Sequence, residues 1–437
     1  MKVFIHAFGC QMNKLDAELV LSDLLRAGHT RCDTPDDADL ILYNTCSVRE
    51  HAEERVYSNV GKLKPLKDRR PDLLIGILGC MAQKDQKAIF RRLPHVDLVV
   101  GTREFSRIAE LVDEARRKRR VLACGEGGHV REERDVRHRE NRFQDFITIM
   151  RGCDNYCAYC IVPCVRGREV SRPMDEIVEE ARRLTGDGVR EITLLGQNVN
   201  SYGKSFDQPG ALVDLLGRVA VLPGLARLRF VTSHPKDMTP DILRAMRDLP
   251  AVCEHLHMPP QSGNDRILKA MNRKYTAAHY RELVALARET VPGIALAGDF
   301  IVGFPGETEA EFDDTAALLR DMRFGTAFVF KYSPRPGTAA ARLPDDVPEP
   351  EKRRRNQVLL GIQSHIALEE NARFVGREVE VLVEGPSLRD PARLTGRLRT
   401  NHIVVFPGPA SLAGELVRVQ IESSTALTLK GKRVAPR

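Results

Sequence analysis

The stretch that decides the fold is residues 149–160, IMRGCDNYCAYC, in which Cys153, Cys157 and Cys160 stand in CxxxCxxC spacing. A cubic iron–sulfur cluster normally takes four protein thiolates. Three thiolates from one loop would leave the fourth iron open, so the spacing favours a cluster that binds and reduces a small molecule. A zinc site usually combines two CxxC or histidine pairs, and this region has neither a second CxxC nor a histidine. An iron–sulfur cluster is therefore favoured over a zinc site or free thiols.

The aromatic residue before the last cysteine adds a resemblance. Radical S-adenosylmethionine (SAM) enzymes carry CxxxCxΦC with an aromatic side chain at Φ, and Tyr159 occupies that place. The stretch resembles this superfamily, and the resemblance implies a 4Fe–4S cluster on the three cysteines with SAM bound beside it. Tyr159 is accordingly a candidate cofactor-binding residue.

The first part of the chain contributes three more cysteines. Apolar strand-like runs alternate there with helical periodicity, which is typical of a doubly wound parallel sheet. The expected strands are residues 2–8, 40–43, 73–78 and 96–100. Cys10, Cys46 and Cys80 each come just after one of these strands. Because ligand sites of open α/β sheets lie outside the strand carboxyl ends, we expect the three thiols to converge on a second cluster. The alternative is three separately buried thiols.

The central part of the chain repeats the strand–helix alternation. The expected strands are residues 146–150, 191–195, 227–231, 254–258, 294–302 and 327–332. Six units are too few for a closed eight-stranded barrel and predict an open, partial (β/α)6 barrel, whose active face is at the strand carboxyl ends.

Polar and glycine-rich loops follow the central strands and supply candidates for SAM contacts. Gly196 and Gly303 would permit close backbone approach, and Gln197, Ser233 and Gln261 would hydrogen-bond the ligand. Ordinary loop polarity is the alternative for each of them. No catalytic residue is predicted beyond the cluster ligands, because histidines such as His234 and His257 more often satisfy local hydrogen bonds than act as acid or base.

The last part of the chain changes character after a charged helix at 349–372. Five short strands, at 378–383, 395–398, 402–406, 416–421 and 427–429, predict a small all-β barrel. The barrel carries a set of basic residues: Arg389, Arg393, Arg397, Arg399, Lys430, Lys432 and Arg433. Such a barrel suits nucleic-acid binding, and a structural barrel with a solvated basic face is the alternative.

Length and composition limit the class of protein. The 437 residues allow two or three domains, and the net charge of +7 is compatible with an RNA partner. No apolar run approaches the roughly 18 residues of a membrane span. We therefore expect a cytoplasmic protein without membrane contact, in which the ten cysteines serve metal or catalytic roles rather than disulfides.

Motifs from one end of the chain to the other resemble the radical SAM methylthiotransferase family. They are Gly9–Asn13, Asn44–Arg49, Gly79–Gln83, Met150–Cys160, Gly167–Arg172, Thr232–Pro235, Gln261–Gly263, Asp299–Glu307 and Tyr332–Thr338. The resemblance implies an N-terminal methylthiotransferase domain at 1–120, a linker at 121–144, a radical SAM domain at 145–371 and an RNA-binding TRAM domain at 372–437. Two departures stand out: Cys164 replaces a usual aromatic residue, which leaves its role open, and Pro260 replaces a usual valine.

The resemblance also implies the chemistry. Members of the family bind two 4Fe–4S clusters and SAM, with an auxiliary cluster on Cys10, Cys46 and Cys80. Gln11 and Met12 resemble the tRNA-modifying branch, which converts N6-isopentenyladenosine at tRNA position 37 to its 2-methylthio derivative. The implied partners are a tRNA anticodon loop, a reducing electron donor and a sulfur source, and a monomer is expected. Alternatives are a methylthiotransferase of ribosomal protein S12 or of threonylcarbamoyladenosine tRNA, and a non-catalytic iron–sulfur RNA-binding protein.

Overall fold

A computed structural model describes residues 1–47, 50–125, 134, 139, 141–208 and 210–435 of the chain. It divides into two compact units, which we describe separately. The first unit comprises Met1–Glu140, Arg151–Asp154 and Ile161–Glu169, and the second comprises Asn141–Met150, Asn155–Cys160 and Val170–Arg437. Most of the linker expected at 121–144, and the last two residues of the motif Asn44–Arg49, lie outside the described residues.

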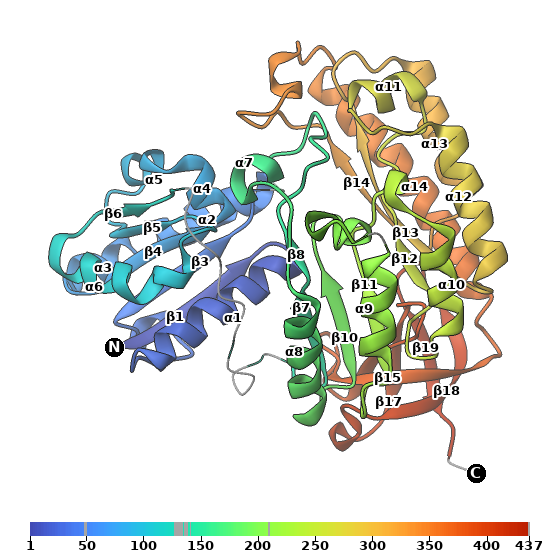
Figure 1. The fold of residues 1–437 in the computed structure, drawn as a ribbon, viewed down its shortest axis with the longest axis horizontal. Helices are drawn as coiled ribbons and strands as arrows, with labels where there is room; N and C mark the ends of the chain where they lie inside the picture. Colours follow the sequence, from blue (N-terminus) through green and yellow to red (C-terminus); the bar gives the residue numbers. More distant parts are fainter. Residues whose placement is uncertain (48–49, 126–133, 135–138, 140, 209, 436–437) are drawn as a thin grey trace. The chain divides into compact units, whose positions relative to one another are not determined.

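The first unit is built on a parallel sheet of six strands in the order β2-β1-β3-β4-β5-β6 (Figure 1). The strands are β1 (Lys2–Phe8), β2 (Thr30–Arg31), β3 (Leu40–Thr45), β4 (Leu74–Gly79), β5 (Leu98–Val100) and β6 (Val121–Ala123). The four expected strands are present. The expectation that residues 121–123 begin a linker is wrong, because they pair with β5 as the edge strand β6. A run of three residues is too short to show a strand period.

Helices cover both faces of this sheet, as a doubly wound fold requires. They are α1 (Gln11–Arg26), α2 (Glu50–Gly61), α3 (Lys64–Arg69), α4 (Cys80–Asp85), α5 (Lys87–Arg92) and α6 (Ile108–Lys118). Successive residues of a strand point to opposite faces. Leu40 and Leu42 therefore pack into one core with α1 and α6, whereas Ile41 and Tyr43 pack into a second core on the other face. A short helix that follows the CxxxCxxC motif, α7 (Val162–Arg166), also belongs to this unit.

The second unit contains the six central strands that the sequence predicts. They are β7 (Gln144–Thr148), β10 (Glu191–Leu195), β11 (Arg227–Phe230), β12 (His255–His257), β13 (Ala295–Val302) and β14 (Thr326–Lys331). They form two parallel three-stranded sheets, β11-β10-β7 and β12-β13-β14, and a single bridge joins Leu228 to Val252 between them. The result is an open, partial barrel of a (β/α) type, with two short strands, β8 (Met150–Arg151) and β9 (Val170–Ser171), near its start.

The helices of the second unit follow the strands in the expected alternation (Figure 1). They are α8 (Met174–Gly186), α9 (Ala211–Ala220), α10 (Pro240–Asp248), α11 (Asp265–Ala270), α12 (Ala277–Thr290), α13 (Glu309–Met322) and α14 (Glu349–Ala372). In the described part of the chain, none of the helices combines the length and the apolar character that crossing a bilayer needs.

The C-terminal segment of the second unit forms a closed five-stranded barrel in the order β15-β16-β17-β19-β18. Its strands are β15 (Glu378–Pro386), β16 (Arg393–Arg397), β17 (Ile403–Pro407), β18 (Leu416–Ser424) and β19 (Leu429–Arg433). Four of the five expected strands are present, and the fifth, expected at 427–429, begins at Leu429 and runs to Arg433. Inward residues such as Val404, Phe406 and Ile421 fill a core of the barrel's own.

The small barrel is joined to the partial barrel through arginines. Arg227 and Arg229 on β11 donate to the main-chain carbonyl oxygens of Arg397 (2.6 Å) and Arg399 (2.6 Å), respectively. The Arg399 side chain in turn pairs with Glu254 at 2.8 Å. Arg399 was expected on a basic face for RNA, and the structure places its guanidinium in this junction instead.

Candidate metal centres and active face

The first unit brings the three N-terminal cysteines together. Cys10 precedes α1, Cys46 follows β3, and Cys80 is the first residue of α4 after β4. A hydrogen bond with Cys46 and, against the effect of burial, the positive charge of Arg166 lower the pKa of Cys10 to about 6. Cys80 is buried, which raises the pKa of its thiol, and it lies close enough to Cys10 to interact with it electrostatically. The expected convergence at the strand carboxyl ends is thus seen, and the role of these thiols as metal ligands stays a prediction.

Two glycines make this convergence sterically possible. Gly9 has φ +128°, and a Cβ there would stand 2.3 Å from the Cβ of Cys46. Gly79 has φ +94°, and a Cβ there would stand 2.3 Å from Oδ1 of Asn44. A side chain at either position would therefore push one cysteine-bearing strand end away from its neighbour.

Buried amides lock the same strand ends. Asn13 on α1 donates from Nδ2 to the carbonyl oxygen of Thr45 at 2.9 Å, and Asn44 donates from Nδ2 to the carbonyl oxygen of Asn13 at 2.8 Å. The Cys10 thiol donates to Oδ1 of Asn13 at 3.1 Å. The two amide bonds fix the segments that carry Cys10 and Cys46 to one another without using a thiol.

Three thiols with a nearby cation are a donor set that fits an iron–sulfur cluster, which is anionic when held by thiolates. Across the residues that the structure describes, no group of three or more His, Cys, Asp or Glu side chains is placed so that it could hold a metal ion, so the ligand role of the thiols stays a prediction. The nearest carboxylate, Asp16, is fully buried and bonded to both Arg151 (2.8 Å) and Arg166 (2.7 Å). The thiols are therefore the groups in this site that remain to bind a metal.

The CxxxCxxC loop is shared between the two units. Cys153 belongs to the first unit, where its amide donates to the carbonyl oxygen of Gly167 at 3.1 Å, whereas Cys157 and Cys160 belong to the second. Cys164 is exposed on α7. The assignment of Cys153, Cys157 and Cys160 as ligands of one cluster remains a prediction from their spacing.

Sequence reasoning missed Arg273, which lies beside the second-unit part of this loop. Its guanidinium is buried and its Nη1 is 3.4 Å from Sγ of Cys157 and 3.4 Å from the hydroxyl oxygen of Tyr159. Nη2 donates to the carbonyl oxygen of Pro259 at 2.9 Å. Burial raises the pKa of Tyr159, so the phenol stays neutral. Arg273 follows α11 by three residues in a polar loop, and nothing in the local pattern separates it from an exposed arginine.

The polar residues expected to contact SAM gather at the carboxyl ends of the central strands. The amide of Val199, in the loop after β10, donates to the carbonyl oxygen of Thr232 at 3.0 Å. The amide of Ser233 donates to the carbonyl oxygen of His257 at 3.0 Å. Gln261 forms a bridge with Phe300 of β13. The loops after β10, β11, β12 and the strand β13 are thus hydrogen-bonded to one another in a single face.

Buried polar atoms on this face lack partners in the described structure. They are Oε1 of Gln197, Oγ of Ser233 and Nε2 of His234. Buried polar groups are nearly always hydrogen-bonded in native proteins. Three such atoms on neighbouring loops therefore fit a polar ligand such as SAM, in agreement with the roles expected for Gln197 and Ser233.

Backbone strain is concentrated on the same loops. Thr232 has φ +73° and Gln261 has φ +70°, both in the left-handed region that β-branched and other bulky residues rarely adopt. Strain of this kind clusters at ligand sites, where the surrounding structure holds it. The amide of Thr232 donates to Nδ1 of His257 at 3.2 Å, which gives this histidine a structural partner.

The two candidate glycines are explained by packing as well as by ligand approach. A Cβ on Gly196 would stand 2.6 Å from Cγ of Met150, and a Cβ on Gly303 would stand 2.4 Å from Cγ of Lys352. The amide of Gly303 donates to the Glu307 carboxylate at 2.6 Å. Both glycines are thus required by the fold, and their contact with SAM stays a prediction.

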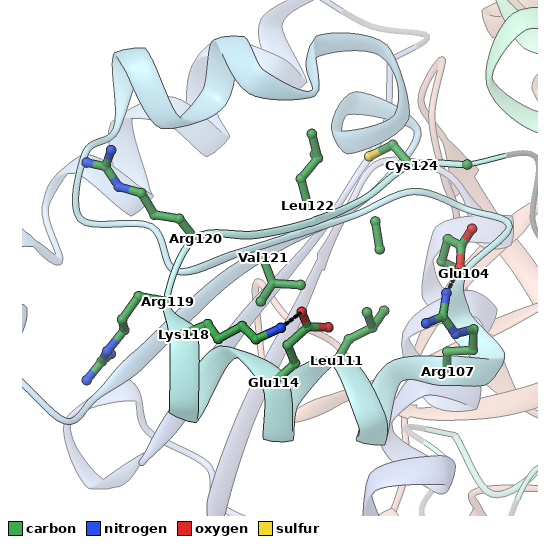
Figure 2. Close-up of a pocket in the computed structure, with 12 residues that line it drawn as sticks. Glu104, Arg107, Leu111, Glu114, Lys118, Arg119, Arg120, Val121, Leu122 and Cys124 are labelled. Carbon is green, nitrogen blue, oxygen red and sulfur yellow. Dashed lines mark hydrogen bonds and ion pairs between the residues drawn. The ribbon is translucent and has the colours of Figure 1, made fainter.

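A separate hollow of about 430 Å³ lies on the first unit between α6 and β6 (Figure 2). Four of its charged residues pair with one another: Arg107 with Glu104 at 2.9 Å, and Lys118 with Glu114 at 3.4 Å. Cys124 on its wall donates to the carbonyl oxygen of Ala82, and burial raises its pKa to about 11. These features satisfy the local structure and indicate no further chemistry.

Comparison with known families agrees with this division of the chain. Residues 2–101 match a family described as uncharacterized protein family UPF0004, residues 147–319 match the radical SAM superfamily, and residues 372–434 match the TRAM domain. The fold resembles the radical SAM methyltransferase TsrM from Kitasatospora setae, at a TM-score of 0.57 and 15% identity over 78% of this chain and 76% of that one.

Relatives at much higher identity cover almost the whole chain. It is 47% identical to tRNA-2-methylthio-N(6)-dimethylallyladenosine synthase of Acetivibrio thermocellus, over 98% of this chain and 90% of the relative. It is 46% identical to the synthase of the same name from Moorella thermoacetica, over 98% of each. The chain therefore belongs to the tRNA-2-methylthio-N(6)-dimethylallyladenosine synthase family of radical SAM transferases.

Proposed function

We propose that this enzyme adds a 2-methylthio group to N6-isopentenyladenosine at position 37 of tRNA, as the names of its relatives indicate for those proteins. The observation that carries the proposal is the convergence of Cys10, Cys46 and Cys80 at one sheet edge, in a chain that also has the CxxxCxxC motif. A single cysteine trio would suffice for a radical SAM enzyme without sulfur transfer.

The ligand assignment follows from these two groups of thiols. Cys153, Cys157 and Cys160 would hold the cluster that binds SAM, and the N-terminal trio would hold an auxiliary cluster. Replacing the hydrogen on C2 of adenine is beyond the acid–base strength of side chains. When bound, the clusters and SAM would supply radical chemistry, sulfur and the methyl group, with a reducing electron donor and a sulfur source as further partners.

The residues of the chain would position the reactants. Arg273 fixes Cys157 and Tyr159, and Gln197 and Ser233 offer buried polar atoms for SAM. The target base would have to leave its stack to reach the active face. Phosphates of the anticodon loop would be held by basic residues of the small barrel other than the Arg399 side chain, which pairs with Glu254.

Two cysteine variants test the proposal. Cys157→Ala should abolish formation of 5′-deoxyadenosine from SAM while the auxiliary cluster still assembles. Cys46→Ala should retain SAM cleavage and lose the methylthio product, as measured by mass spectrometry of tRNA nucleosides. Methylthio product from Cys46→Ala would refute the auxiliary role. Nucleosides from a deletion strain that keep 2-methylthio-N6-isopentenyladenosine would refute the substrate, and loss of another methylthio product would indicate one of the alternatives.

A further inference from the structure

The first unit contains a buried cation that the proposed chemistry does not yet use. The side chain of Arg166, the last residue of α7, is 5% exposed, and its Nη2 donates to Oδ2 of Asp16 at 2.7 Å. Its Nη1 is buried and has no hydrogen-bond partner in the described part of the chain. A buried guanidinium N–H without an acceptor is costly, so this atom indicates that an acceptor is missing from the protein alone.

Two thiols of the cysteine trio, those of Cys10 and Cys80, lie close enough to this arginine to interact with its charge. Ile161, next to α7, and Val165, within it, pack against Cys80. The hydroxyl of Thr102 donates to the carbonyl oxygen of Val165. The positive charge of Arg166 acts on the thiols of both Cys10 and Cys80: it helps to lower the pKa of Cys10 and opposes the rise that burial causes in the pKa of Cys80. Arg166 is thus buried and held by the packing of α7 close to the thiols of Cys10 and Cys80.

Asp16 shares its charge between two arginines. It is fully buried and bonded to Arg151 at 2.8 Å and to Arg166 at 2.7 Å. The carboxylate therefore orients the Arg166 guanidinium without being its partner alone. The N-terminus of α1, directly after Cys10, adds the positive end of a helix dipole, which favours an anion at this end of the helix.

We propose that Arg166 is a positioning residue for the cluster that Cys10, Cys46 and Cys80 would hold, with Nη1 donating a hydrogen bond to a sulfur atom of that cluster and Asp16 orienting the guanidinium. The inference rests on the proposed function, since it needs the auxiliary cluster. A cluster held by three thiolates is anionic, and uptake of one electron makes it more so. A fixed cation beside it favours the reduced form, and hydrogen bonds to cluster sulfurs act in the same direction. Arg166 therefore raises the reduction potential, and Asp16 lowers it.

The test is a redox titration of the auxiliary cluster followed by electron paramagnetic resonance. The full-length chain carries Cys153→Ala, Cys157→Ala and Cys160→Ala, so that only the N-terminal trio can hold iron. In this background, Arg166→Gln should lower the midpoint potential and Asp16→Asn should raise it. We expect each to change the ratio of reduced to oxidised cluster about tenfold at fixed potential, which is about 59 mV for a one-electron couple. Arg166→Lys, which keeps the charge, should restore part of the shift.

Arg168→Gln is the matched control, since Arg168 lies two residues further on with a side chain 82% exposed, and it should leave the potential unchanged. A merely structural role for Arg166 and Asp16 predicts shifts of the same sign or none, and either result would overturn the inference. Loss of iron from the Arg166→Gln, Arg166→Lys and Asp16→Asn proteins alike would also overturn it. Failure of the triple-alanine background to bind about four iron atoms would instead refute the ligand assignment of the proposed function.

Discussion

Replacing Gly79 by alanine should remove one of the two clusters while leaving a folded protein. Gly79 has φ +94° and ψ −155°, and an added Cβ would stand 2.3 Å from Oδ1 of Asn44 and 2.7 Å from the carbonyl oxygen of Thr45. The backbone conformation costs a non-glycine residue about 1–3 kcal/mol. Relieving the clash costs about another 1–3 kcal/mol. The sum of about 2–6 kcal/mol is below or near the roughly 5–15 kcal/mol of a typical domain.

Relief of this strain should move the ends of β3 and β4 apart. Asn44 and Thr45 directly precede Cys46, and Gly79 directly precedes Cys80. Pushing the end of β4 away from the end of β3 therefore separates these two cysteines. We expect Gly79→Ala to bind about four iron atoms per chain after anaerobic reconstitution, against about eight for the parent with two 4Fe–4S clusters. The free energy of unfolding, measured with urea on the metal-free proteins, should fall by the amount given above.

Gly28→Ala is the control that distinguishes the cost of a positive φ from the cost of a steric clash. Gly28 also has a positive φ, +84°, but a Cβ there would meet nothing within 4 Å. Its substitution should cost about 1 kcal/mol and leave the iron content unchanged. If Gly79→Ala retained about eight iron atoms and lost no more stability than Gly28→Ala, the steric account of the cysteine trio would be refuted.

Three further predictions concern the second unit. Arg273→Gln should lose the cluster associated with Cys157 and its SAM cleavage while about four iron atoms remain, because the guanidinium beside that thiol is gone; normal SAM cleavage would contradict this. Burial, followed by the charges of Arg273 and Lys236, lowers the pKa of His234 to about 2. Below pH ~6.5 His234 is therefore protonated in the unfolded chain and stays neutral in the folded chain. Stability present above that pH should therefore fall by up to about 1.4 kcal/mol per pH unit on acidification, and urea midpoints of His234→Gln at pH 7, 6 and 5 should change less than those of the parent. Arg229→Met leaves the carbonyl oxygen of Arg399 at the small-barrel junction without its donor, at about 1–3 kcal/mol, whereas the carbonyl oxygen of Leu398 keeps the Asn401 amide as a donor. The variant should give an earlier first transition in calorimetry; an unchanged melting profile would argue against the junction.

The positions of Cys10, Cys46 and Cys80, the candidate ligands of the first unit, could be predicted because they depend on local patterns. A strand period followed by a helix period places the strand ends to within a residue or two, and the end of a parallel strand is where a ligand can be reached. Cys10, Cys46 and Cys80 therefore converge as expected. The strands of the small barrel could be predicted from the sequence for a similar reason, because turns with glycine and proline separate its short apolar runs.

The charged partners could not be predicted because their contacts are long-range. Asp16 and Arg166 are 150 residues apart, and neither lies in an unusual local pattern. Arg273 looks like one more basic residue after a short helix. The charge pattern of the small barrel was misleading for Arg399, whose side chain pairs with Glu254. A count of basic residues cannot distinguish an arginine that meets RNA from one that joins two barrels.

The arginines bear on the alternative that the N-terminal cysteines are merely buried thiols. A neutral thiol that only fills space in a core is a poor hydrogen-bond acceptor. Burying a guanidinium beside such a thiol would add no strong hydrogen bond and would cost the free energy of desolvating the arginine's charge. Arg166 is buried against Cys10 and Cys80 with one N–H unsatisfied, and Arg273 is buried at 3.4 Å from Cys157. The same arrangement at both cysteine groups favours negative charge on sulfur at each site. Thiolates bound to iron carry such charge, so the arrangement fits the proposed clusters better than it fits buried neutral thiols.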